Sequence, residues 1–252
     1  MIDIITNKLK EIESAENVRI IHAVESGSRA WGFASTDSDY DVRFIYVRPK
    51  DFYLKLESTR DIIEWQLDET LDINGWDLQK ALRLLHQSNP TFFEWSNSPI
   101  IYKTTAEWAE IQAEINTYFS NKSGLLHYLS TAHSNYREYL KGEIVKLKKY
   151  FYVLRPLLAC KWILENKCPP PVLFSELCNA VLEDDMKDIV DDLLRRKICS
   201  SEVGESKRID RLNQYIDTNL AELESVISAM PKDSHFEWNG LNELFLKSVL
   251  KD

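Results

Sequence analysis

Long hydrophobic runs are missing from this sequence, since no apolar stretch approaches the roughly 18 residues that a membrane-spanning helix needs. The first residues, MIDIITN, include no basic segment followed by an apolar core and a small-residue cleavage site. The sequence therefore predicts neither a membrane span nor a secretory signal peptide, and it favours a cytoplasmic location.

Cysteine is scarce, with 4 residues in 252, and no two of them form a Cys-x-x-Cys pair. Disulfide frameworks and zinc sites usually show closely spaced cysteine pairs, whereas these cysteines lie among segments of helical pattern. We expect them to be reduced core cysteines. They are Cys160, Cys168, Cys178 and Cys199.

Positive charge is also in short supply, because 31 Lys and Arg residues face 40 Asp and Glu residues, for a net charge of −9. An extended surface that binds nucleic acid without regard to sequence needs a field of Lys and Arg. The composition argues against such a surface and leaves room only for a local basic groove. At 252 residues the chain can bury a substantial core, as one large domain or two modest ones.

The stretch that carries chemistry is ESGSRAWGFASTDSDYDVRFIYV, residues 25–47. Residues 18–24 before it are rich in β-branched side chains and predict a strand that ends in a turn. At this turn Gly27 lets a phosphate approach main-chain N–H groups, and the Ser28 hydroxyl adds one more donor. Residues 30–38 predict a loop with at most one helical turn. Residues 41–47 alternate as a second strand, with Val42, Phe44 and Tyr46 on one face.

Two carboxylates, Asp39 and Asp41, stand at the start of this second strand. Residues two apart in a strand project to the same face, so a strand that reaches back to Asp39 places both carboxylates together. Two close carboxylates repel each other and need a cation, for which Mg²⁺ (or Mn²⁺) is suited because it prefers oxygen ligands. Beside a turn that can hold the phosphates of an NTP, the pair predicts metal-assisted nucleotidyl transfer. The alternative is a surface β-hairpin with an acidic loop.

Gly-Ser at the end of one strand, a ten-residue spacer and Asp-x-Asp entering another strand together resemble the DNA polymerase β-like nucleotidyltransferase superfamily. Longer segments resemble the RlaP family of predicted nucleotidyltransferases, which is assigned to RNA repair. They are ESGSRAWGFASTDSDYDVRFIYVRP, LDINGWDLQKALRLLHQSNPTFFEWSNSPIIY and KLKKYFYVLRPLLACKWI.

The resemblance implies an α+β fold, with a polymerase β-like sheet and flanking helices followed by a C-terminal helical bundle. It also implies that Gly27 and Ser28, with the adjoining Arg29, contact the triphosphate, and that Asp39 and Asp41 hold the metal. It further implies a third metal-binding carboxylate on a later strand.

Two residues compete for the role of third carboxylate. Residues 62–67 and 70–74 predict two strands joined at 68–69, and Asp72 lies inside the second of them. Asp77 instead precedes an apolar helical pattern over residues 78–86, which is typical of an N-cap with a purely structural role. We favour Asp72, and Asp77 remains the alternative. Asn89-Pro90 should end that helix, before a short helix over residues 91–95 and a strand over 99–102.

The composition changes near residue 104, where strand-like alternation gives way to long amphipathic segments. We therefore predict a nucleotidyltransferase domain over residues 1–104 and a helical domain over 105–252, with the active site in the cleft between them. A first helix over residues 2–16 should pack on the sheet. The helices predicted for the second domain cover 105–119, 124–141, 143–166, 175–184, 188–199 and 205–230.

Within the helical domain, Lys141, Lys148, Tyr152 and Arg155 recur at spacings of seven, four and three, which predicts that they share one helix face. Lys and Arg can meet a triphosphate while Tyr152 stacks on a base. The alternative is a solvated lysine face beside an ordinary core stripe. Because the segment also resembles a family motif, we favour the nucleotide-binding interpretation for Lys148, Tyr152 and Arg155.

Together these features predict an enzyme that moves a nucleoside monophosphate from an NTP such as ATP to an acceptor hydroxyl and releases pyrophosphate. The resemblance favours an RNA end as acceptor. The alternatives are transfer to a protein or small molecule, which the acidic composition favours, and a catalytically silent nucleotide-binding module. The sequence predicts no oligomeric state.

Overall fold

The computed structural model describes residues 1–251 apart from 68–69, 200–204 and 232–235. Two compact units emerge from its contacts. The first unit comprises residues 1–30, 39–118 and 235–252, and the second comprises residues 31–38 and 119–234. The predicted division into domains 1–104 and 105–252 is drawn differently and stays a prediction.

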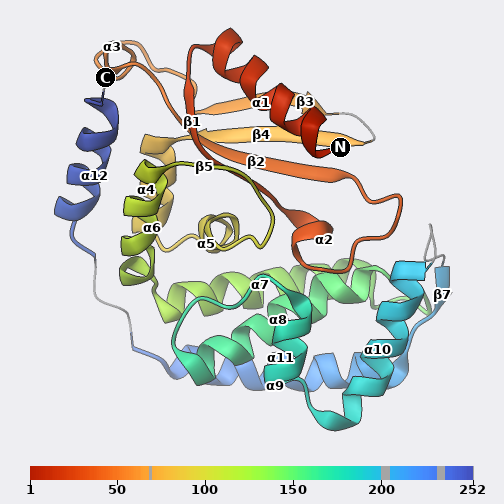
Figure 1. Cartoon of the computed structure of the whole chain (residues 1–252). Helices are drawn as coiled ribbons and strands as arrows, with labels where there is room; N and C mark the ends of the chain where they lie inside the picture. The colour runs from red at the N-terminus through yellow and green to blue at the C-terminus, as the bar shows by residue number, and fades with distance from the viewer. Residues whose placement is uncertain (68–69, 200–204, 232–235, 252) are drawn as a thin grey trace. The chain divides into compact units, whose positions relative to one another are not determined.

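The first unit contains five strands and most of the shorter helices of the described chain (Figure 1). Their bounds are α1 Ile2–Glu16, β1 Arg19–Glu25, α2 Gly27–Ala30, β2 Tyr40–Val47, α3 Lys50–Tyr53, β3 Ile62–Leu67, β4 Leu71–Asp77, α4 Leu78–His86, α5 Pro90–Ser96, β5 Ile101–Thr104, α6 Ala106–Glu114, the 3-10 helix η1 Ile115–Tyr118 and α12 Asn239–Val249.

The five strands form one mixed sheet in the order β3-β4-β2-β1-β5. Strands β1 and β2 are antiparallel, as are β1 and β5, and β3 and β4. Strands β2 and β4 run parallel, because the chain between them returns through α3 and β3 before β4 begins. The turn predicted at 68–69 lies outside the described residues, but the two strands that flank it pair as predicted.

One face of this sheet is covered by α1, and Figure 1 shows α4, α5 and α6 on the other side. Three apolar residues of α1, Ile5, Leu9 and Ile12, are buried in a cluster with Val42, Phe44 and Tyr46 of β2, whereas Ile2 and Ile4 are exposed. The predicted helix over residues 2–16 and the predicted inward face of β2 are therefore confirmed.

The helices of the second unit pack around a core that is centred on α8. Helices α7 and α9 both contact α8. Helix α11 contacts both α7 and α8. The bounds are α7 Asn121–Tyr139, β6 Ile144–Lys146, α8 Lys149–Asn166, α9 Phe174–Val181, α10 Asp184–Cys199, β7 Glu205–Lys207 and α11 Asp210–Ala229.

Two of the predicted helices begin too early. Residues 143–146 and 205–207 were expected to be helical, but they contain β6 and β7, which pair as a two-stranded antiparallel sheet. The helices start only after these strands, at Lys149 and Asp210. The predicted α+β class, a sheet with flanking helices followed by helical segments, is confirmed.

Within the described residues no helix combines the length and the apolar character that would let it cross a membrane. Cys160, Cys168 and Cys178 are free thiols, and the Cys199 side chain lies outside what the structure describes.

Candidate active site

The turn after β1 brings main chain and carboxylate into direct contact. Gly27 has φ of 59°, in the left-handed region that favours glycine. A Cβ atom on Gly27 would lie 2.0 Å from Oδ2 of Asp41, so no other residue fits here without moving the carboxylate. The Ser26 N–H donates to the Asp41 carbonyl oxygen at 2.8 Å and ties the turn to β2. The predicted phosphate-binding turn and the second aspartate of the Asp-x-Asp pair are therefore neighbours.

A buried glutamate fixes the contact between this turn and β2. Glu25 is the last residue of β1 and is fully buried. Its Oε1 accepts a hydrogen bond from the Asp41 N–H at 2.9 Å, and its Oε2 accepts one from the Tyr102 hydroxyl. Burial, opposed by these hydrogen bonds, raises the pKa of the Glu25 carboxyl. Through its bond to the Asp41 main chain, Glu25 positions the start of β2.

The parallel pairing of β2 with β4 places Asp72 beside Asp41. The two residues are direct partners in the register. Paired residues of neighbouring strands project to the same side of a sheet, so the two carboxylates point the same way. Asp72 thus occupies the position expected of the third carboxylate, on a later strand next to the first pair.

Arg43 lies between these two carboxylates. Its Nη2 donates to Oδ1 of Asp41 at 3.0 Å and to Oδ2 of Asp72 at 2.6 Å. Its Nη1 donates to the carbonyl oxygens of Val42 and Asp72 at 3.1 and 3.0 Å. The guanidinium is mostly buried, with 14% of the side chain exposed. One nitrogen therefore serves both carboxylates, which shows that they converge on a single cation.

The charge state of Asp41 reflects this crowding. Burial raises the pKa of its carboxyl, the Arg43 guanidinium opposes that shift, and the negative charges of Asp39 and Asp72 add to it. A carboxylate that is desolvated and faces two others is stabilised by a cation. The donor chemistry of Asp39, Asp41 and Asp72 thus suits Mg²⁺ or Mn²⁺. Among the residues that the structure describes, however, no three His, Cys, Asp or Glu side chains form a group that could hold a metal ion.

Asp39 lies one residue before β2 and is exposed. We expected Asp39 and Asp41 to share a strand face if the strand included Asp39. The strand begins one residue later, so this arrangement is not formed. Its carbonyl oxygen accepts from Nε of Arg29 at 2.9 Å, and the Arg29 guanidinium lies 3.7 Å from the centre of the Tyr40 ring. Ser28 is half-buried in α2. The predicted residues of the first unit thus lie around the start of β2, whereas Lys148, Tyr152 and Arg155 belong to the second unit.

Asp77 has the structural role that the sequence indicates. It is the N-cap of α4, and its Oδ1 accepts from the Gln79 N–H at 2.8 Å. Its Oδ2 accepts from the Tyr53 hydroxyl at 2.9 Å. It lies at the far end of β4 from Asp72. The geometry therefore favours Asp72 over Asp77 as a partner of Asp41.

The predicted basic and aromatic helix face in the second unit is wrong. Lys141 precedes β6, and Lys148 is the residue before α8, so neither belongs to the helix. Within α8, Tyr152 is exposed whereas Arg155 is buried, with its guanidinium 4.6 Å from the centre of the Trp31 ring. Periodicity continued through residues 141–148, but the chain there forms a bend and a short strand.

Arg43 and Glu25 are the residues that sequence reasoning missed. A glutamate beside Ser-Gly-Ser is typical of an exposed turn, and nothing local indicates that Glu25 is buried. Arg43 lies on the face of β2 opposite to its apolar face, and strand alternation puts it on the same face as Asp41. Alternation alone does not indicate that Arg43 bonds the carboxylates. Its partner Asp72 comes from a strand pairing that local sequence does not reveal.

The chain is similar to known proteins over almost its whole length. Residues 1–247 match the family described as RlaP, RNA repair pathway DNA polymerase beta family. The uncharacterized protein YcgL of Bacillus subtilis (strain 168) is 43% identical over 247 residues, which cover 97% of this chain and 95% of that protein.

A solved structure of a nucleotidyltransferase-like protein from Exiguobacterium sibiricum 255-15 is 16% identical, and the match covers 98% of this chain and 89% of that one with a TM-score of 0.32. The first match spans almost the whole chain, and this chain therefore belongs to the RlaP family, the RNA repair pathway DNA polymerase beta family.

Proposed function

We propose that this protein is a metal-dependent nucleotidyltransferase that moves a nucleoside monophosphate from an NTP to a hydroxyl at an RNA end and releases pyrophosphate. The observation that carries the proposal is the convergence of Asp41 and Asp72 on one cation, directly beside the Gly27 turn. The family to which the chain belongs supports the reaction class, and its description supports RNA as the acceptor.

The chain's own residues have separate tasks in this proposal. Gly27 leaves room for the Asp41 carboxylate and for a phosphate to approach the main chain, while Ser28 supplies a hydroxyl donor. Glu25 fixes the main chain of Asp41. Asp39, Asp41 and Asp72 would hold Mg²⁺ or Mn²⁺, which when bound neutralises phosphate charge and activates the attacking hydroxyl.

Within the second unit, the predicted nucleotide contacts remain a separate proposal. Lys148 and Tyr152 are both exposed, and we propose that they contact the triphosphate and the base. The guanidinium of Arg155 is buried against the Trp31 ring, so we propose that Arg155 positions that ring for contact with the nucleotide. Arg29 is proposed to act near the phosphates, because its guanidinium already lies at the start of β2.

The test uses α-labelled NTPs, Mg²⁺ or Mn²⁺ and a mixed pool of RNA, protein and small-molecule acceptors. Wild-type protein should transfer label to RNA and release pyrophosphate, and Asp39→Ala/Asp41→Ala protein should lose at least about 100-fold of that rate. Asp3→Ala is the control, because Asp3 is an exposed acid of α1 outside the proposed site. Equal labelling by all three proteins, or none by any of them, would contradict the proposal.

The acceptor class is decided in the same experiment. The net charge of −9 favours a protein or small-molecule acceptor over a long RNA surface. Label that appears on protein or on a small molecule would replace the RNA end while keeping the reaction. Metal-dependent NTP binding without any transfer would identify a nucleotide-binding module instead.

A further inference from the structure

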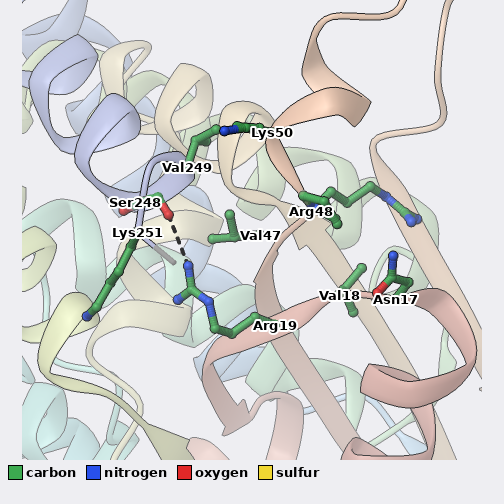
Figure 2. A pocket seen from close by; sticks show the side chains of 10 residues that line it. Asn17, Val18, Arg19, Val47, Arg48, Lys50, Ser248, Val249 and Lys251 are labelled. Atoms are coloured by element: carbon green, nitrogen blue, oxygen red, sulfur yellow. Dashed lines mark hydrogen bonds between the residues drawn. The ribbon is translucent and has the colours of Figure 1, made fainter.

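A pocket of about 370 Å³ in the first unit is lined by an unusual number of cations (Figure 2). Four of its ten lining residues are Lys or Arg, and none of the ten is acidic, although the whole chain carries a net charge of −9. The cations come from the start of β1, the end of β2, the start of α3 and the residues after α12. They are Arg19, Arg48, Lys50 and Lys251.

This pocket is separate from the candidate active site. In the register of β1 and β2, Arg19 pairs with Val47 at one end, and Glu25 pairs with Val42 at the other. A strand of this length spans about 20 Å. The pocket therefore lies at the end of the strands opposite to Asp41.

Two of the four cations are held in place by carboxylates behind them. Arg19 donates to the Ser248 carbonyl oxygen at 3.0 Å and forms an ion pair with Glu107 (Figure 2 shows the first contact). Arg48 donates to the Glu16 carbonyl oxygen at 2.9 Å and to its Oε2 at 3.3 Å. The Arg48 guanidinium also lies 4.5 Å from the centre of the Phe52 ring. Both guanidinium groups are thus fixed.

The two lysines supply charge that these carboxylates do not fully offset. Lys50 is exposed, and Lys251 lies 3.9 Å from Glu107 with 56% of its side chain exposed. Four cations line the pocket, and their ion pairs in the described residues involve two carboxylates, those of Glu16 and Glu107, so two positive charges are left unmatched by these pairs. A phosphate monoester carries about −1.5 to −2 at neutral pH, so its charge matches this surplus. Asn17 lines the same pocket and can add a neutral donor.

We infer that this pocket binds a phosphate group. The phosphate belongs either to a free phosphorylated small molecule or to the phosphorylated end of an RNA strand, since both present the same dianion. The volume lies within the roughly 300–1,000 Å³ of small-ligand sites. The inference does not depend on the proposed nucleotidyl transfer, because the pocket uses none of the predicted metal ligands.

The test compares wild-type protein with a Lys50→Gln/Lys251→Gln variant, in EDTA and at constant ionic strength. Inorganic phosphate is titrated and binding is measured by calorimetry and by the shift in melting temperature. Wild type should bind, and the variant should bind at least about 10-fold more weakly, because each charged contact contributes strongly to anion binding. A Lys8→Gln/Lys10→Gln variant of α1 removes the same total charge outside the pocket and should bind like wild type.

Two oligoribonucleotides identify the source of the phosphate. They share one sequence, and one carries a terminal 5′-phosphate whereas the other carries a 5′-hydroxyl. A preference for the phosphorylated strand that disappears in the Lys50→Gln/Lys251→Gln variant assigns the pocket to an RNA end. Binding of inorganic phosphate without this preference assigns it to a small molecule.

Absence of phosphate binding in wild type would overturn the inference, as would equal binding by the pocket variant and the α1 variant. Asp39→Ala/Asp41→Ala protein should still bind phosphate in EDTA while it loses nucleotidyl transfer. Failure of the pocket and failure of the proposed reaction therefore give different results.

Discussion

Arg43 offers the sharpest test of how the carboxylates of Asp41 and Asp72 are held together. Replacement of Arg43 with Gln removes the guanidinium that bonds both Asp41 and Asp72, and it leaves two carboxylates facing each other. These side chains are 23% and 24% exposed, so their ion pairs lie between the exposed and the buried case. Exposed pairs contribute about 0–1 kcal/mol, and loss of a partner in a buried pair costs about 3–5 kcal/mol.

We therefore expect Arg43→Gln to lower the free energy of unfolding in EDTA by about 2–3 kcal/mol. For a chain of this length that corresponds to a fall in melting temperature of about 4–12 °C. The measurement is urea and thermal denaturation at pH 7. Arg60→Gln is the matched control, because Arg60 pairs with Glu64 in an exposed ion pair of the same unit, and its loss should change stability by less than about 1 kcal/mol.

The Arg43→Gln variant also tests how the site responds to a metal ion. With the guanidinium gone, Mn²⁺ no longer competes with it for Asp41 and Asp72, so Mn²⁺ should raise the melting temperature of Arg43→Gln more than that of wild type. In a double-mutant cycle, Asp72→Asn should restore part of the stability lost in Arg43→Gln by removing one of the repelling charges. If Arg43→Gln were as stable as wild type in EDTA and gained no more from Mn²⁺, Arg43 would not be the counter-cation of this site.

Three further changes test separate parts of the structure. Asp77→Ala should destabilise the protein by about 1 kcal/mol through loss of the N-cap of α4, as denaturation would show, whereas Asp72→Asn should abolish label transfer. Gly27→Ala should abolish Mg²⁺-dependent NTP binding measured by calorimetry, because its methyl group would displace the Asp41 carboxylate. Burial lowers the pKa of His22 from 6.5 to about 4, so below pH 6.5 the unfolded chain takes up a proton that the folded protein takes up only near pH 4. The stability that His22 contributes is thus complete above pH 6.5 and falls by about 3 kcal/mol towards pH 4, a loss that denaturation of His22→Phe should not show.

Matched controls keep these results specific. Gly32→Ala also places a side chain at positive φ, at 84°, but its methyl group would meet Leu173 rather than a carboxylate, so NTP binding should persist. His127→Gln changes an exposed histidine and should keep the wild-type pH profile. Transfer that survives Asp72→Asn and is lost in Asp77→Ala would reverse the assignment of the third carboxylate.

The sheet was largely predictable because its signals are local. Alternation placed Val42, Phe44 and Tyr46 on the buried face of β2, and the N-cap role of Asp77 followed from the apolar helix after it. The parallel pairing of β2 with β4 was not predictable, since it joins strands that lie far apart in the chain. Contacts that depend on it, above all those of Arg43, were therefore missed.

In the helical part the prediction was wrong for a different reason, because a helical spacing of side chains continued into residues that are not helical. Spacing from Lys141 to Arg155 matched a helix, yet residues 144–146 pair with 205–207 as a short sheet. Gly142 and the β-branched pair Ile144-Val145 were the local signals against a helix there. Helix α12 was not predicted at all, although its buried Leu241 anchors it in the first unit.

The placement of α12 has a consequence for how the chain matures during synthesis. This helix contacts α4 and α6, so the unit that carries Asp41 and Asp72 includes a segment that is synthesised after the second unit. Residues 119–234 are all synthesised before it, and the second unit can therefore pack while the first still lacks a helix. A nascent chain that stops before residue 239 would display the Asp-x-Asp segment on an incomplete fold, and the first unit would be complete only after residues 239–249 have been added.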